Sequence, residues 1–156
     1  QEVASIAEAA LEASGDDYNV YVPIENSLMA LGKDETVRTM RQRRILALEG
    51  HLNQVPEDAR ARTHLSVAYT SLGRTDDAAR ELNLAMALRP NDAMVLYNAT
   101  CLFCRMQKKS EALGARSRAW DAGYKDADWA RRDPDLALLH GDPEFERLFP
   151  EPAAGA

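Results

Sequence analysis

The residues of this chain whose side chains could bind a metal or carry out redox chemistry are two cysteines and three histidines. Cys101 and Cys104 form a Cys-x-x-Cys pair, a spacing found in zinc sites and in redox centres. A zinc site needs two further ligands, but there is no second cysteine pair, and His51, His64 and His140 fall on different predicted elements. A redox centre needs a strand-to-helix turn, whereas the segment YNATCLFCRM reads as the middle of a helix. We therefore expect two small side chains on a packed or groove-lining helix face, with no metal and no cofactor.

A second group that could bind a ligand is basic. Four arginines lie between residues 38 and 44, namely Arg38, Arg41, Arg43 and Arg44. They could bind an acidic partner, but such a run is more often a solvated helix face, and Asp34 and Glu35 before it suit a helix start. Three residues nearby, Tyr18, Tyr21 and Pro23, could also contact a ligand, but we expect them to pack between repeats.

The sequence carries no recognisable catalytic motif. It has no glycine-rich phosphate loop, no His-Glu-x-x-His and no Gly-x-Ser-x-Gly. Its carboxylates are spread over polar stretches rather than paired in an apolar one, and His140 reads as a helix end. We therefore expect a protein that is not an enzyme.

Composition narrows the class further. The chain has 156 residues, 46% hydrophobic and 28% charged, which suits one helix-rich globular domain. With 25 acidic and 19 basic residues its net charge is −6, which disfavours nucleic acid and anionic membranes as partners. No apolar run could span a bilayer, the opening does not resemble a signal peptide, and there is no initiator Met. We expect a piece of a longer protein, and the two cysteines suit the cytoplasm.

The dipeptide Asp-Ala recurs at a fixed interval. It begins at Asp58, Asp92 and Asp126, each 34 residues after the last. Such a period is the sequence signature of helical repeats. In the unit 59–92, Leu65 and Tyr69 share one face of a first helix, which Gly73 ends. Thr75 is the expected N-cap of a second helix, whose buried face carries Ala78, Leu82 and Ala85.

This unit resembles the tetratricopeptide repeat (TPR) in its period and in its residues. The family's Trp-x-x-Leu-Gly-x-x-Tyr becomes Arg62-x-x-Leu65-Ser66-x-x-Tyr69, its Ala-x-x-x-Phe becomes Ala78-x-x-x-Leu82, and its closing proline is Pro90. The unit 93–126 keeps Phe103, Ala112 and Ala119 in register and has Tyr124 in place of the proline. The resemblance implies an all-α fold, a right-handed α-α superhelix.

The unit before these two is longer. Leu31-Gly32 lies 41 residues before Leu72-Gly73, seven more than the period. Because seven residues make almost two helical turns, the insertion lengthens the second helix without rotating its end far. We expect one continuous helix over residues 36–54, about 28 Å long. The expected units are a half repeat (1–17), a lengthened repeat (18–58) and two ordinary repeats (59–92 and 93–126).

Both ends of this single domain, 1–150, depart from the pattern. Residues 1–17 supply one helix of a pair, with Val3, Ala7 and Ala10 inward, and we expect its bare edge to self-associate weakly and more repeats to precede it. In the tail 127–150, Asp133-Pro134 and Asp142-Pro143 each read as a helix start, which predicts a two-helix cap. Its expected sealing residues are Trp129, Leu136, Leu139, Phe145, Leu148 and Phe149. Residues 151–156 read as a disordered tail. The tail resembles the ends of repeat regions in bacterial multidomain signalling proteins.

In the TPR family, the first helix of each pair lines a concave face that binds ligands. The resemblance therefore implies a peptide groove lined by Val22, Asn26, Met29, Thr63, His64, Val67, Thr70, Met94, Tyr97, Asn98, Cys101 and Arg105. Members that grip a peptide carboxylate use Lys, Asn and Arg at five positions, and this chain keeps one of them, Asn26. We therefore expect a neutral, partly apolar groove, with Arg105 as its only charge, that suits an extended or helical peptide.

The sequence thus predicts a scaffold that binds a protein or peptide in its groove. One alternative keeps the fold but makes it a regulatory or positioning segment of a larger multidomain enzyme, such as a Ser/Thr kinase, an adenylate cyclase or a glycosyltransferase. A second alternative is an RNA-reading helical repeat, which would need a basic, polar groove.

Overall fold

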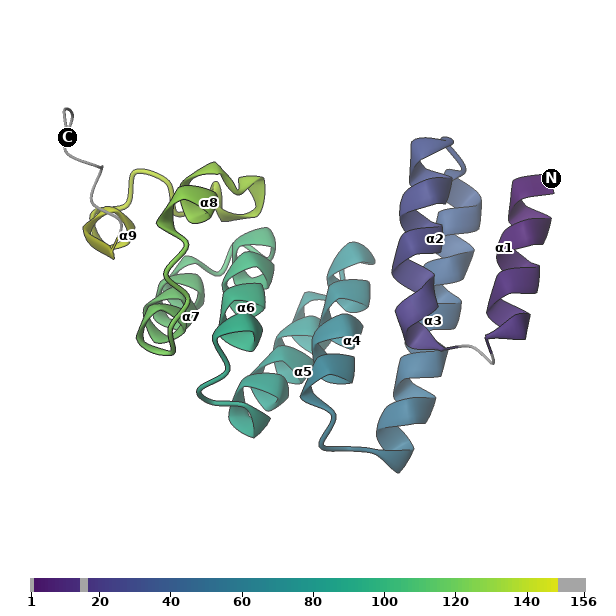
Figure 1. The fold of residues 1–156 in the computed structure, drawn as a ribbon, viewed down its shortest axis with the longest axis horizontal. Helices are drawn as coiled ribbons and strands as arrows, with labels where there is room; N and C mark the ends of the chain where they lie inside the picture. Colours follow the sequence, from purple (N-terminus) through teal and green to yellow (C-terminus); the bar gives the residue numbers. More distant parts are fainter. Residues whose placement is uncertain (1, 15–16, 149–156) are drawn as a thin grey trace.

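Antiparallel helix pairs, stacked side by side, make up the chain (Figure 1). The computed structural model describes residues 2–14 and 17–148, and the regular structure of these residues is entirely helical. The helices are α1 (Glu2–Ala13), α2 (Tyr18–Ala30), α3 (Asp34–Gln54), α4 (Ala59–Ser71), α5 (Thr75–Leu88), α6 (Ala93–Arg105), α7 (Lys109–Asp121), α8 (Ala127–Arg132), the 3-10 helix η1 (Pro134–Leu136) and α9 (Pro143–Leu148). Helix α2 pairs with α3, α4 with α5, and α6 with α7. The fold is therefore an α-α solenoid.

The recurring aspartates mark where the first helices begin. The side chains of Asp58, Asp92 and Asp126 accept hydrogen bonds from backbone N–H groups in the first turns of α4, α6 and α8. Asp17 does the same for α2. Each bond satisfies an N–H group that the helix itself leaves unpaired. The Asp-Ala period thus has a structural cause, and the division of the chain into repeats remains our proposal.

The turns between paired helices follow one pattern. Gly32 and Gly73 end α2 and α4 in the left-handed region, at φ of 65° and 73°, and Gln107 takes the same place after α6 at 60°. The prediction that Thr75 caps α5 is wrong, because the helix begins at Thr75 itself and Arg74 before it makes no side-chain cap. The short turn leaves Thr75 inside the first helical turn, where its hydroxyl lies 3.5 Å from the carbonyl oxygen of Gly73.

Helix α3 is longer than its counterparts. It runs without a break for 21 residues, whereas α5 has 14 and α7 has 13. Gly50 lies within it and does not interrupt it, which confirms the prediction of one continuous helix. Figure 1 shows α3 extending well past the end of α2 toward α4.

The core falls into three clusters rather than one. The first joins α1, α2 and the start of α3, and the second joins the end of α3 to α4 and α5. The largest extends from α5 through α6 and α7 into the tail. The predicted burial of Leu65, Tyr69, Leu82 and Ala85 is confirmed, with each at most 3% exposed.

The N-terminal helix differs from its prediction. Ala10 and Ile6 are exposed, whereas, among the side chains of α1 that the structure describes, Leu11 is fully buried. The inward orientation predicted for Ala10 is therefore wrong, because Leu11 rather than Ala10 packs with Tyr21 and Leu28 of α2. The side chains of Val3 and Ala7 lie outside the described residues.

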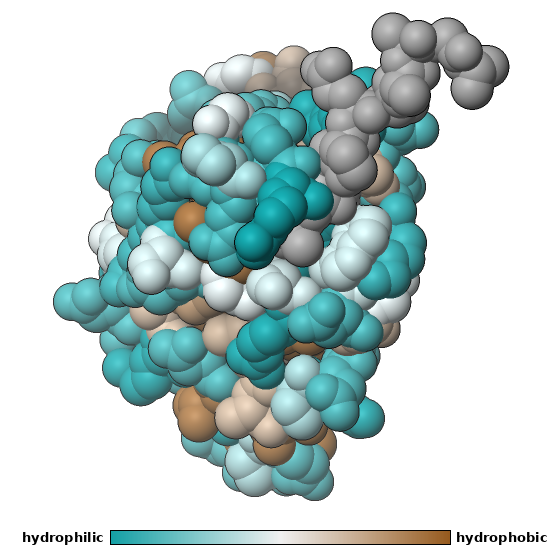
Figure 2. All heavy atoms as spheres, turned by 90° about the vertical axis from the view of Figure 1, so that its left-hand side faces the viewer, coloured by the Kyte–Doolittle hydropathy of each residue, from teal (hydrophilic) through white to brown (hydrophobic). Residues whose placement is uncertain are grey.

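The tail covers the last helix pair, and both predicted helix starts are confirmed: Asp133-Pro134 starts the three-residue η1, and Asp142-Pro143 starts α9. It also has a further helix, α8, which begins at Ala127 and was not predicted. Leu136, Leu139 and Phe145 are fully buried against α6 and α7. The side chain of Leu148 and the whole of Phe149 lie outside the described residues. Seen from this end, the described surface is mostly hydrophilic, which suits the terminus of a stack (Figure 2).

Among residues 2–14 and 17–148, no helix is both long enough and apolar enough to cross a membrane.

Candidate groove between the first helices and the cap

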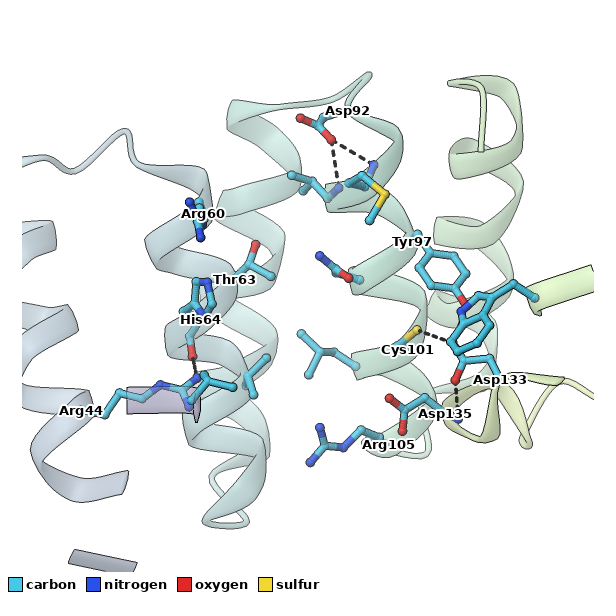
Figure 3. A pocket seen from close by; sticks show the side chains of 17 residues that line it. Arg44, Arg60, Thr63, His64, Asp92, Tyr97, Cys101, Arg105, Asp133 and Asp135 are labelled. Carbon is cyan, nitrogen blue, oxygen red and sulfur yellow. Dashed lines mark hydrogen bonds between the residues drawn. The ribbon is translucent and has the colours of Figure 1, made fainter. Parts of the chain in front are cut away.

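A cavity of about 690 Å³ lies between α4 and α6 (Figure 3). Nine of the twelve predicted groove residues line it: Val22, Thr63, His64, Val67, Met94, Tyr97, Asn98, Cys101 and Arg105. Asn26 and Thr70 do not line it, and Met29 lines a separate depression beside Arg38 and Arg41. The structure thus brings together all five predicted residues of α6 and three of the four on α4, but only one of the three predicted on α2.

Helical spacing explains how α6 forms one wall. Met94, Asn98, Cys101 and Arg105 follow one another at intervals of three or four residues, so they lie along one face of the helix. Met94 is 56% exposed, and Asn98 is also exposed. This face carries apolar side chains and an amide that is open to a ligand.

Sequence reasoning missed most of the charge in this cavity. Arg44, Arg60, Asp92, Asp133 and Asp135 also line it, so the prediction of Arg105 as its only charge is wrong. A helical pattern could have identified Arg60, which lies four residues before His64 on the same face of α4. The residues from α3 and from the tail have no periodic relation to the groove.

Arg44 is the most deeply buried of the cationic side chains in the cavity wall. It is 2% exposed, and its Nη1 lies 3.2 Å from Oε1 of Glu25, itself buried on α2. Its Nη2 donates to the backbone carbonyl of His64 at 3.0 Å. The predicted solvated face is therefore wrong for Arg44, because the lengthened α3 carries it between α2 and α4. Burial lowers the pKa of Arg44, and the adjacent carboxylate of Glu25 partly offsets this by favouring the charged guanidinium.

His64 presents a neutral ring to the same region. Burial, reinforced by Arg44 and Arg60, lowers the pKa of His64 to about 4. Its ring lies 5.5 Å from that of Tyr18, which comes from the start of α2. At neutral pH the side chain of His64 therefore offers an uncharged aromatic ring rather than a cation, and the positive charge of this wall comes from Arg44 and Arg60.

Tyr97 is a buried residue of the cavity wall. We expected a partly exposed side chain, and this is wrong, since Tyr97 is only 5% exposed. Its ring stacks on Tyr124 with a centroid distance of 4.0 Å, and its hydroxyl donates to the carboxylate of Asp133. Burial and this hydrogen bond raise the pKa of Tyr97. The side chain turns inward because Asp133 provides the acceptor that its hydroxyl needs once buried.

The two cysteines lie on α6, as expected, and both are free thiols. Cys101 lines the cavity and donates to Asp133 with a sulfur–oxygen distance of 3.8 Å, whereas Cys104 is buried. Burial raises the pKa of Cys101 and raises that of Cys104 to about 12. Both thiols therefore stay protonated at neutral pH and are weak nucleophiles. No group of three metal-ligating side chains occurs within the described part of the chain.

Comparisons with known proteins give only distant similarities. No protein-family model matches the chain. It is 22% identical over 111 residues to a chloroplastic protein of Arabidopsis thaliana, over 68% of this chain and 33% of that protein. A solved structure of MamA (AMB-1) aligns with a TM-score of 0.47 and 23% identity, over 76% of this chain and 61% of the other. The chain spans less than two thirds of each of these proteins, and neither similarity is close enough to assign a function.

Proposed function

We propose that this chain is a TPR-type scaffold that binds a peptide segment of a partner protein in the cavity between α4 and α6. The observation that carries the proposal is the gathering of nine predicted groove residues around one cavity. The exposed wall of that cavity is more apolar than polar. A mostly apolar depression with a few placed polar groups is the usual composition of a ligand site.

Asn98 is the central polar group of this site. It is exposed on α6 between Met94 and Cys101, so its amide can donate to and accept from the backbone of a bound peptide. Apolar side chains of the peptide would then pack on Met94 and on Val67 of the opposite wall. Binding through the backbone and through packing needs no reactive group, in keeping with a scaffold rather than an enzyme. A cytoplasmic location, suggested by the two free cysteines, belongs to the same proposal.

The test is selection of peptides on the purified protein from a display library of random short peptides. For the selected peptides, fluorescence anisotropy would give Kd for the wild type and for the variant Asn98→Ala. We expect affinity to fall about tenfold, which is typical of losing an important contact at a binding surface. The melting temperature should stay within a degree or two, because Asn98 is exposed.

Asn83→Ala is the matched control. Asn83 is also an exposed helical asparagine, but it lies on α5 and does not line the cavity, so its replacement should leave Kd unchanged. Equal binding by the wild type and Asn98→Ala would show that the peptides bind elsewhere. A loss of several degrees in melting temperature with unchanged Kd would make Asn98 a structural residue.

A further inference from the structure

The tail of this chain does more than seal the stack. Leu136, Leu139 and Phe145 are fully buried, whereas Trp129, the largest apolar side chain of the tail, is 50% exposed. The expectation that Trp129 seals the last repeat is therefore wrong. Its side chain instead lines the cavity between α4 and α6, which α8 thereby extends.

We propose that Trp129 is a ligand-contacting residue, and that the tail supplies the part of the groove that receives an aromatic or long aliphatic side chain of a non-acidic peptide. This inference rests on the proposed peptide-binding function and adds the chemical class of the peptide.

The first support is that hydrogen bonds fix the backbone of Trp129. Its backbone N–H donates to Oδ1 of Asp126 at 2.9 Å, and its carbonyl accepts from the N–H of Asp133 at 2.9 Å. The carboxylate of Asp133 in turn accepts from Tyr97 and Cys101 on α6. These bonds join α8, through Asp133, to α6, so the backbone of Trp129 is fixed relative to α6 in the absence of a ligand.

The second support is the apolar surface that Trp129 shares with α6. Among the large hydrophobic side chains that the described residues leave exposed, Met94 and Trp129 are the two that line this cavity, at 56% and 50% exposure. A tryptophan left half-exposed in a depression keeps a large apolar area in water, and burial of that area favours binding. Tryptophan is also among the residues most enriched at the energetic centres of interfaces.

The third support is the charge around this end of the cavity. Asp133 and Asp135 line it from the tail. Figure 3 shows these two carboxylates close together near the end of α6, away from Asp92 at its start. An acidic side chain next to Trp129 would meet these carboxylates, whereas an apolar side chain would not. Asp133 and Asp135 therefore disfavour an acidic residue directly beside Trp129, although Arg44, Arg60 and Arg105 line other parts of the cavity.

The experiment uses the peptides selected on the wild-type protein. We expect them to share a position rich in Phe, Leu, Met or Trp, with Asp and Glu depleted next to it. Trp129→Ala should weaken their binding about tenfold or more, with circular dichroism and melting temperature unchanged. Trp129→Phe should recover most of the affinity, because it restores an aromatic surface.

The other tryptophan provides the control. Trp120 on α7 does not line the cavity, so Trp120→Phe should leave Kd unchanged, and it leaves Trp129 as the sole tryptophan. Adding a selected peptide to that variant should shift the fluorescence emission to shorter wavelength, as the indole leaves water.

The outcomes separate this inference from the proposed function. If Asn98→Ala weakens binding and Trp129→Ala does not, the groove binds peptides without the tail and the inference fails alone. If selected peptides are acidic beside the apolar position, the charge argument is wrong. If neither variant alters Kd, the proposed function itself fails.

Discussion

The two contacts between successive helix pairs differ in whether apolar or polar side chains lie between the first helices of the pairs. Helix α4 packs directly on α6, and one apolar cluster continues from α5 through α7 into the tail. Helix α2 makes no comparable contact with α4. Between these two lie the buried pair of Arg44 and Glu25 and the bond from Arg44 to the carbonyl of His64.

Aromatic and acidic groups complete this polar junction. The ring of Tyr18 lies 5.2 Å from that of His51 and 5.5 Å from that of His64. Its hydroxyl donates to Asp58 at 3.4 Å, and Nε2 of His51 lies 2.8 Å from the same carboxylate. The contact between α4 and α6 is thus apolar, whereas polar groups lie between α2 and α4, and the apolar contact between these two pairs comes from α3 instead. We call these the apolar junction (α4 with α6) and the polar junction (α2 with α4). The comparison shows that the longer α3 also coincides with a change in the side chains that lie between the first helices, from apolar to polar.

The largest effect should come from the apolar junction. Leu96 lies on α6, is fully buried, and belongs to the cluster that joins three helices and the tail. Leu96→Ala removes packed atoms and leaves a cavity, so we expect the free energy of unfolding to fall by about 3 kcal/mol. Urea denaturation followed by circular dichroism measures this. A loss below about 1 kcal/mol would mean that the cluster collapses around the gap and is not closely packed.

A single substitution in the polar junction should lower the free energy of unfolding almost as much. A second substitution, in the partner residue, should restore it. Arg44→Ala leaves Glu25 buried without its closest cation, and Arg41 lies at 3.5 Å from it, so we expect a loss of about 3 kcal/mol. Replacing both partners, as Glu25→Leu with Arg44→Met, should restore stability to within about 1 kcal/mol of the wild type or exceed it. If the double variant is no more stable than Arg44→Ala, the pair contributes net stability and the polar junction is not merely a matter of geometry.

Arg44 also marks the limit of what the sequence could predict. The positions of α4 and α6 followed from the 34-residue period, and the length of α3 followed from the interval of 41 residues. These features depend on local hydrogen bonds and on helical period, both of which are written in consecutive residues. The burial of Arg44 depends on how far apart two helix pairs stand, which local pattern does not determine.

The same reasoning explains the mixed result for the groove. The residues predicted on α4 and α6, Thr70 apart, line one cavity because they recur with the repeat. Trp129 and Asp133 come from a tail that leaves the period, and the inward turn of Tyr97 depends on Asp133. No repeat pattern could have placed them together. The site was therefore predictable where it is periodic and unpredictable where the non-periodic tail completes it.

The smallest expected effect is a pH dependence that belongs to the polar junction alone. Folding lowers the pKa of His64 from 6.5 to about 4, chiefly through burial. Since the unfolded chain then binds a proton more readily than the folded one, stability should fall as pH drops from 6.5 toward 4. His64→Gln has no ring to protonate, so its free energy of unfolding should fall less steeply over this range. Urea denaturation at a series of pH values would measure both slopes.

Leu96→Ala is the control that separates this effect from low stability in general. It weakens the apolar junction and keeps His64, so its stability should fall with pH as steeply as that of the wild type, from a lower starting value. If His64→Gln keeps the full slope, the acid sensitivity comes from the carboxylates that many helix caps share, such as Asp58 and Asp17, whose hydrogen bonds lower their pKa values. If only His64→Gln flattens the slope, acid acts first on the polar junction, and the first helix pairs should separate from α4 before the apolar stack unfolds.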